Sequence, residues 1–268
     1  MSAAVTGGER IAEAFESARA DGRRAALMPY LMAGYPDLDR SREIARAYVE
    51  GGADLIELGV PFSDPLADGP VIHAADVAAL AAGANLTDAL SVAREVADRV
   101  PVVVMCYVNV ILARGLERFA EMLLAVGASG LIVPDLPLEE APATLAALDA
   151  RGLALVPLVA PTTPDERLAQ IGARARGFLY TVSVTGTTGE RSGNVGGLPA
   201  ILARARAHTD VPVAVGFGIG TPAQAAAAAQ AGADGVIVGS RLVRAAGESD
   251  APAEQVLSLV RAFATALG

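Results

Sequence analysis

Short runs of apolar residues alternate along the chain with longer amphipathic segments rich in alanine. Apolar runs of about four to eight residues predict buried strands, and apolar residues recurring every three to four positions predict helices. Eight runs predict strands: residues 25–32, 54–60, 102–107, 130–133, 154–158, 178–183, 213–215 and 236–238. The long apolar run at 100–113, broken by Pro101 and Asn109, is interpreted as a core strand and a loop.

Helices are predicted between these strands and at both ends of the series. The segments between strands are 39–50, 71–82, 87–98, 116–126, 138–150, 164–171, 199–208 and 221–231. An extra helix near 9–20 precedes the first strand, and two more, around 241–246 and 253–267, follow the last. Two of the segments, 71–82 and 87–98, follow the second strand, so an extra helix is expected there as well.

Continuous apolar strands alternating with helices indicate βαβ units whose parallel sheet is covered on both faces. Glycine-containing phrases at 51–54, 127–130 and 232–235 introduce three of the strands in the same way. Eight such units in one chain predict a single (βα)8 TIM barrel domain spanning residues 1–268. The alternative is an open doubly wound sheet, but residues 32–36 after the first strand lack the glycine fingerprint of that fold.

Composition limits the classes of partner and the cellular location that we expect. Of the 268 residues, 53% are hydrophobic and 19% are charged, so a large core can form. The net charge of −9 argues against nucleic acid or an anionic membrane as partner. The first 24 residues show no apolar signal segment, and Cys106 is the single cysteine, so we expect a cytoplasmic protein.

The chain contains no lysine, so all 21 basic residues are arginine. Mechanisms that need a lysine amine, such as Schiff-base aldol chemistry or covalent attachment of pyridoxal phosphate, are therefore excluded. Only His73 and His208 are present, which argues against a histidine-rich metal site. Carboxylates, hydroxyls and backbone groups remain as the source of the chemistry.

The stretch at 55–70, LIELGVPFSDPLADGP, joins the second strand to a turn rich in acids and prolines. Active sites of barrels lie where the strands end, and Glu57 and Asp68 both fall there. We interpret Glu57 as a buried general acid and base, and Asp68 as a second carboxylate that stabilises developing positive charge. Alternatively, Glu57 pairs with an arginine inside the barrel and Asp68 only shapes the turn with Gly69. For Asp64 the turn role is favoured.

Glycines after the last two strands indicate an anion site. Gly216 and Gly218 follow the seventh strand, and Gly239 and Ser240 follow the eighth at the start of a helix. Backbone N–H groups at such positions bind phosphate without lysine. Tight turns would explain the same glycines.

The loop 185–193 after the sixth strand, which includes Thr188 and Gly189, has the length and glycine content of a lid. An ordinary solvated loop is the alternative. Within the preceding strand, Tyr180 either faces a ligand or, as the default expectation, packs in the core.

Further residues follow the strands without a clear role. Tyr107 and Asn109 follow the third strand, where they either line a pocket or are common loop residues, and Asp135 follows the fourth strand, where a solvated role is equally consistent with its type. His73 is expected to be a satisfied structural histidine, and Cys106 a small core residue.

With these residues in view, the chain resembles the α subunit family of tryptophan synthase. The resemblance extends over nearly the whole chain and rests on a set of motifs: residues 55–70, Pro29-Tyr30, Met105-Cys106-Tyr107-Val108-Asn109, Thr188-Gly189, Gly216-Phe217-Gly218 and Gly239-Ser240. It implies a TIM barrel that cleaves indole-3-glycerol phosphate to indole and glyceraldehyde 3-phosphate. It also implies a partner, a pyridoxal-phosphate-dependent β subunit in an α2β2 heterotetramer, with no cofactor in this chain.

The resemblance implies roles for individual residues. Glu57 would carry protons, Asp68 would accept the indole N–H, and Tyr180 would orient Glu57. The phosphate would bind at Gly189, Gly218, Gly239 and Ser240, under a lid that includes Thr188. Gly216 is added to this set for its place after the seventh strand.

Three residues depart from the family pattern in the loops after the second, third and sixth strands: His73 replaces glutamine, Val110 replaces proline and Thr187 replaces valine. Two alternatives share the residues, namely a free-standing indole-releasing lyase and a catalytically silent regulatory subunit. The presence of both Glu57 and Asp68 argues against the silent subunit.

Overall fold

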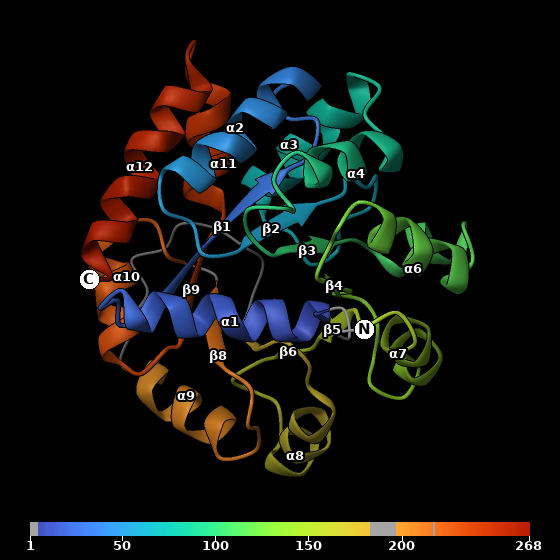
Figure 1. Ribbon diagram of the computed structural model, residues 1–268, viewed down its shortest axis with the longest axis vertical. Coiled ribbons are helices and arrows are strands. Elements are labelled where there is room, and N and C mark those ends of the chain that lie inside the picture. Colours follow the sequence, from blue (N-terminus) through green and yellow to red (C-terminus); the bar gives the residue numbers. More distant parts are fainter. Residues whose placement is uncertain (1–4, 183–196, 217) are drawn as a thin grey trace.

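The computed structural model describes residues 5–182, 197–216 and 218–268. Within them, parallel strands form a nearly closed barrel surrounded by helices (Figure 1). The strands are β1 (Ala26–Met32), β2 (Ile56–Gly59), β3 (Val102–Met105), β4 (Gly130–Ile132), β5 (Ala154–Val156), β6 (Leu158–Val159), β7 (Leu179–Val182), β8 (Val213–Gly216) and β9 (Gly235–Val238). The predicted TIM barrel is therefore confirmed, and the open sheet is ruled out.

The fifth predicted strand, 154–158, is not continuous. It is divided into β5 and β6 at Pro157, because proline has no N–H to donate to a neighbouring strand. The sheet order is β5-β4-β3-β2-β1-β9-β8-β7-β6, so the two outer strands follow one another in the chain. The carbonyl oxygen of Pro157 accepts a hydrogen bond from Tyr180 N (3.0 Å), and the chain itself closes the barrel there.

Helices cover the outside of the barrel, close to the predicted segments. They are α1 (Gly7–Ala20), α2 (Leu38–Glu50), α3 (Pro70–Ala81), α4 (Leu86–Arg94), α5 (Val108–Leu112), α6 (Leu116–Ala125), α7 (Ala141–Asp149), α8 (Asp165–Arg174), α9 (Leu198–Arg206), α10 (Pro222–Gln230), α11 (Ser240–Glu248) and α12 (Pro252–Ala266). The extra helices expected at the N-terminus and after the second and last strands are confirmed as α1, α4 and the α11–α12 pair. Within the described ranges, no helix combines the length and apolar character that a membrane crossing needs.

Helix α5 occupies residues for which a loop was predicted, so that prediction was wrong. A carboxylate from the next strand end stabilises the start of this short helix: Asp135 Oδ1 accepts a hydrogen bond from Val108 N (2.9 Å). Asp135 thus satisfies one of the N–H groups that a helix leaves unpaired in its first turn. This contact joins residues far apart in the sequence, which explains why the local pattern did not predict it.

Helix α1 closes the amino-terminal end of the barrel, where it crosses in front of the strands in Figure 1. Its buried side chains Ile11, Phe15 and Ala18 pack against the residues that point into the barrel. At its start, Thr6 and Glu9 form a capping box, in which each side chain accepts from the other residue's backbone N–H. With this end covered by α1, the barrel interior of the described structure opens at the carboxyl ends of the strands.

Side chains alternate between the barrel interior and the helix-covered outer face along each strand. Leu55 belongs to the interior cluster, whereas Ile56 and Leu58 belong to the outer one. Glu57 therefore points into the barrel. In the parallel register Glu57 lies between Tyr30 of β1 and Val103 of β3.

Candidate active site

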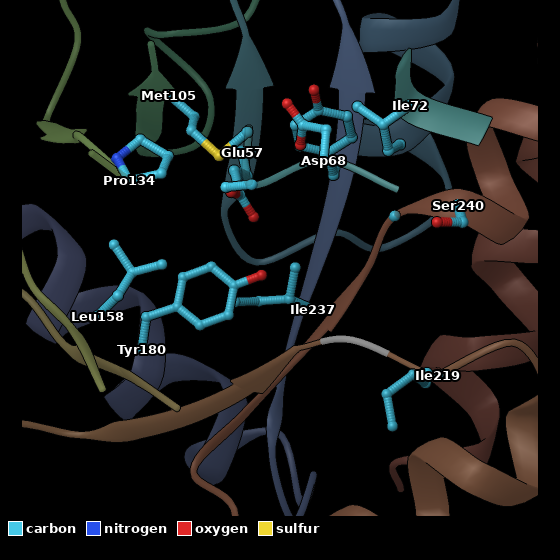
Figure 2. A pocket seen from close by; sticks show the side chains of 14 residues that line it. Glu57, Asp68, Ile72, Met105, Pro134, Leu158, Tyr180, Ile219, Ile237 and Ser240 are labelled. Atoms are coloured by element: carbon cyan, nitrogen blue, oxygen red, sulfur yellow. The ribbon is translucent and has the colours of Figure 1, made fainter. Parts of the chain in front are cut away.

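A cavity opens at the carboxyl ends of the strands, and strands on opposite sides of the barrel contribute to it (Figure 2). The interior residues that line it are Tyr30, Glu57, Met105, Leu158, Tyr180 and Ile237, from six different strands. Loop and helix residues, among them Asp68 and Ser240, complete the wall. The cavity therefore has an apolar lining into which a few polar groups project, as is typical of a small-molecule site.

Glu57 is the central polar group of the cavity. It is 2% exposed, and Oε2 has no hydrogen-bond partner among the described residues. Burial, and next the negative charge of Asp68, raise the pKa of Glu57 to about 8. No described arginine forms an ion pair with Glu57, so the alternative of an internal arginine pair is wrong. At neutral pH the carboxyl group is mostly protonated and can donate a proton.

Asp68 lies in the loop that follows β2, at the same cavity. Its Oδ2 accepts a hydrogen bond from the Tyr107 hydroxyl (2.9 Å), and that hydroxyl accepts one from Ala67 N (2.9 Å). Burial raises the pKa of Asp68, while the Tyr107 hydrogen bond and the charge of His73 oppose the rise. Tyr107, which was expected at most to line a pocket, therefore fixes the position of Asp68.

Tyr180 projects from β7 towards the cavity, across from Glu57 (Figure 2). Burial, and then the charges of Glu57 and Asp68, raise the pKa of its hydroxyl group well above the ordinary value. The phenol therefore stays protonated beside the two acids. Its position favours the ligand-facing interpretation over simple core packing.

The described residues that were predicted to bind phosphate separate into two groups. Gly218, Gly239 and Ser240 line the cavity. Gly216 instead lies against Tyr180, since a Cβ at this position would be 2.3 Å from the tyrosine hydroxyl oxygen. Gly216 is therefore needed to give Tyr180 room.

Two of the cavity residues, Gly218 and Ser240, have backbone features that suit an anion. Gly218 has a φ of +81°, a backbone conformation that residues other than glycine rarely adopt. Ser240 begins helix α11, where the first N–H groups have no intrahelical acceptor. These N–H groups and the helix dipole favour a bound anion.

The remaining predicted site residues lie elsewhere or cannot be placed. Thr188, Gly189 and the rest of the loop 185–193 lie outside the described residues. Asp64 is exposed and accepts a hydrogen bond from the Ser63 hydroxyl, which agrees with a turn role. His73 is exposed on α3, so the expectation of a satisfied structural histidine was wrong.

Two buried polar residues near the site were not predicted from the sequence. The Tyr30 hydroxyl and Asp76 Oδ2 are buried and have no hydrogen-bond partner among the residues described. Asp76 lies four positions after Ile72, which lines the cavity, so helical periodicity places both on one face of α3. This spacing was the signal that could have identified Asp76.

A second, larger cavity lies outside the barrel between α7 and α8. Most of its lining is apolar, and its charged residues are Asp149, Arg167 and Arg174. Arg167 is already paired with Glu139 (2.8 Å). Among the described residues that line this cavity no carboxyl group is buried, so the barrel cavity is the candidate active site.

Fold and site together define a class: a (βα)8-barrel enzyme with a protonated acid and a second carboxylate in an apolar cavity at the carboxyl ends of its strands. Comparison with known proteins gives the family. The family model described as "Tryptophan synthase alpha chain" matches residues 15–267.

Individual relatives agree with this match. The tryptophan synthase alpha chain of Synechococcus elongatus is 47% identical over 87% of this chain and 88% of its own length. That of Roseiflexus castenholzii is 54% identical over 74% of this chain and 76% of its own. A solved structure of tryptophan synthase from Mycobacterium tuberculosis superposes with a TM-score of 0.90 at 43% identity, covering 96% of this chain and 98% of the other. The chain belongs to the tryptophan synthase alpha chain family, and the resemblance seen in the sequence is confirmed.

Proposed function

We propose that this chain is the α subunit of a tryptophan synthase and cleaves indole-3-glycerol phosphate to indole and glyceraldehyde 3-phosphate. The observation that carries the proposal is the buried Glu57, whose Oε2 has no hydrogen-bond partner among the described residues, beside Asp68 in the barrel cavity. A chain without lysine cannot cleave the carbon–carbon bond through a Schiff base. In this substrate the indole ring itself accepts the electrons once its C3 atom is protonated, so neither lysine nor metal is needed.

Binding orients the substrate between two ends of the cavity. The indole ring packs against apolar side chains such as Met105 and Leu158, and its N–H donates to Asp68. The phosphate binds at the opposite wall, at Gly218, Gly239 and Ser240. We assign Gly189 and Thr188, from the loop after β7, to phosphate binding and to closure over the substrate. Gly216 contributes by making room for Tyr180.

Proton transfer by Glu57 then balances the reaction. Protonated Glu57 donates its proton to indole C3, and the positive charge that develops on the ring nitrogen is stabilised by Asp68. The resulting Glu57 carboxylate removes the proton of the hydroxyl group on the glycerol carbon that is bonded to C3. The O–H electrons form the aldehyde C=O bond, and the electrons of the breaking carbon–carbon bond return to the indole ring. Glu57 ends protonated, ready for the next cycle.

The raised pKa of Glu57 suits both steps. A group with a pKa of about 8 is mostly protonated at pH 7, yet its conjugate base is strong enough to accept a hydroxyl proton. Tyr180, held protonated in the same cavity, is assigned to orienting the Glu57 carboxyl group. Glu57 lies on a strand, which suits a group that must transfer protons from a fixed position. Asp68 lies in a loop, which suits a group that adjusts to the bound ligand.

The partner is a β subunit that carries pyridoxal phosphate and converts indole to tryptophan, in an α2β2 heterotetramer in the cytoplasm. This chain does not fit that cofactor, because it has no lysine for the Schiff base. Two exposed leucines follow strands β2 and β3 at the carboxyl end of the barrel: Leu66 is 85% exposed and Leu112 is 58% exposed. Apolar side chains so exposed beside the cavity mouth suit a surface that docks a partner.

The test is an indole-release assay with indole-3-glycerol phosphate, with and without added β subunit. We expect release by the chain alone and a rate enhancement when the β subunit is mixed in. Release that never responds to the β subunit would favour the free-standing lyase. Binding of the β subunit without any release would favour the silent regulatory subunit.

A further inference from the structure

Asp76 is a buried acid that the proposed mechanism does not use. It lies on α3 and is 1% exposed. Its Oδ1 accepts a hydrogen bond from Phe62 N (3.0 Å), while Oδ2 has no partner among the described residues. No described arginine is paired with it. A carboxylate buried with so few partners lowers the stability of the fold, and such groups concentrate at functional sites.

The contact with Phe62 places Asp76 at the beginning of the loop that carries Asp68. This loop leaves β2 at Gly59 and enters α3 at Pro70. Phe62 lies near its start, and its ring stacks on Tyr107 with centroids 5.0 Å apart and an angle of 21°. Tyr107 in turn donates to Asp68 and accepts from Ala67 N.

The loop is thus held at both ends by one connected set of contacts. Asp76 holds the backbone of Phe62, the Phe62 ring supports Tyr107, and the Tyr107 hydroxyl fixes Asp68. Within the loop itself the described hydrogen bonds are weak or local, such as Asp68 N to Pro65 O at 3.3 Å. Asp76 therefore connects the rigid helix α3 to the otherwise loosely held loop.

The negative charges in this region repel one another, so a buried carboxylate at position 76 costs free energy of folding. A carboxylate kept at such a cost argues against an incidental role for Asp76. Burial and the charge of Asp68 raise the pKa of Asp76 to about 7, although the hydrogen bond from Phe62 opposes the rise. Tyr30 from β1 and Tyr107 face the same acids, and the charge of Asp76 contributes to the raised pKa of each hydroxyl. A neutral apolar residue at this position would avoid the repulsion but would leave Phe62 N without its acceptor.

We propose that Asp76 is a positioning residue: by accepting the hydrogen bond of Phe62 N it holds the loop after β2 so that Asp68 meets the indole N–H. The proposal deepens the proposed function, on which it rests. Asp76 does not itself touch the substrate, because it is absent from the cavity lining. Its effect on the reaction passes through Phe62, Tyr107 and Asp68.

The test compares two substitutions of Asp76. Asp76→Ala removes the acceptor, whereas Asp76→Asn keeps an oxygen that can accept from Phe62 N. We expect Asp76→Ala to lower kcat by about tenfold or more with a smaller change in KM, because Asp68 acts on charge that develops in the transition state. Asp76→Asn should restore kcat to within about threefold of the wild-type value.

A matched control separates positioning from general destabilisation. Asp54 is also a mostly buried carboxylate that accepts from a backbone N–H, that of Leu27 (2.8 Å), but it lies at the opposite, amino-terminal end of the barrel. Asp54→Ala should lower the thermal midpoint without a comparable loss of kcat. A kcat for Asp76→Ala that falls no further than that of Asp54→Ala, at equal loss of stability, would overturn the proposal.

Amide hydrogen exchange on the unliganded chain tests the contact without relying on turnover. In Asp76→Ala the amides of Phe62, Ala67 and Asp68 should exchange about tenfold faster or more, and in Asp76→Asn they should keep near wild-type protection. Equal exchange of Phe62 in the wild-type chain and Asp76→Ala would overturn the proposal, as would equal damage by both substitutions. If the wild-type chain released no indole, the proposed function would fail, while exchange at Phe62 would still decide the role of Asp76.

Discussion

The strongest physical consequence of the site is the effect of Glu57 on stability as a function of pH. In the folded chain the pKa of Glu57 is raised from its ordinary value of 4.5 to about 8. The folded state therefore keeps a proton at pH values where the unfolded chain has released it. The free energy of unfolding consequently falls as the pH rises from about 4.5 to about 8. Above that range the folded state bears the full cost of ionising the buried Glu57 carboxyl group.

The size of this effect follows from the two pKa values. Their difference, about 3.5, corresponds to about 5 kcal/mol, which is an upper limit because water entry and local rearrangement relieve part of the cost. Glu57→Gln keeps the shape of the side chain but does not titrate. We therefore expect Glu57→Gln to match the wild-type chain near pH 4.5 and to exceed its stability by about 2 to 5 kcal/mol at pH 9.

Urea unfolding at pH 5, 7 and 9, followed by circular dichroism, measures this difference. Titrating groups that do not interact with Glu57 are common to both chains and cancel in the comparison. Glu13→Gln, on the exposed face of α1, is the control for losing one negative charge. A stability difference for Glu57→Gln that stays constant with pH, or a less stable variant at pH 9, would refute a buried acid with a raised pKa.

The other predictions concern catalysis and assembly. Asp68→Asn should lower indole release by about 100-fold in steady-state assays, and by removing a negative charge it should lower the pKa of Glu57 and move the alkaline limb of the rate profile to lower pH. Gly216→Ala places a methyl group 2.3 Å from the Tyr180 hydroxyl, so kcat/KM should fall about tenfold with the fold retained; unchanged kcat/KM would contradict a need for Tyr180 in its present position. Leu66→Asp should weaken binding of the β subunit in a titration, whereas Leu124→Asp, 52% exposed on α6, should not; equal effects would count against the proposed docking surface.

Most of the barrel could be predicted from the sequence, because each βα unit carries a local signal. Strands such as β2 and β9 are continuous apolar runs, and the helices between them show helical periodicity. The division of the fifth strand at Pro157 and the short helix α5 were not predicted. Helix α5 depends on Asp135, a long-range contact, and a short apolar segment does not distinguish strand, loop and helix.

The candidate site was predictable to a similar extent. Glu57 is conspicuous because an acid within an apolar strand that points into a barrel has few structural explanations. Asp68 and the residues around it needed the structure, since the Tyr107 and Asp76 contacts join loops and helices that the sequence does not show to be neighbours. Gly216 was assigned to phosphate for its type and its place after the seventh strand, and only its distance from Tyr180 shows what its missing side chain allows.

The most direct test of Glu57 as the proton carrier is indole release from indole-3-glycerol phosphate by the wild-type chain and by Glu57→Gln, each checked for an intact fold by circular dichroism. We expect indole release by the wild-type chain and a loss of at least about 1,000-fold in Glu57→Gln, because both proton transfers pass through this carboxyl group. Wild-type-like turnover by Glu57→Gln would contradict this role of Glu57.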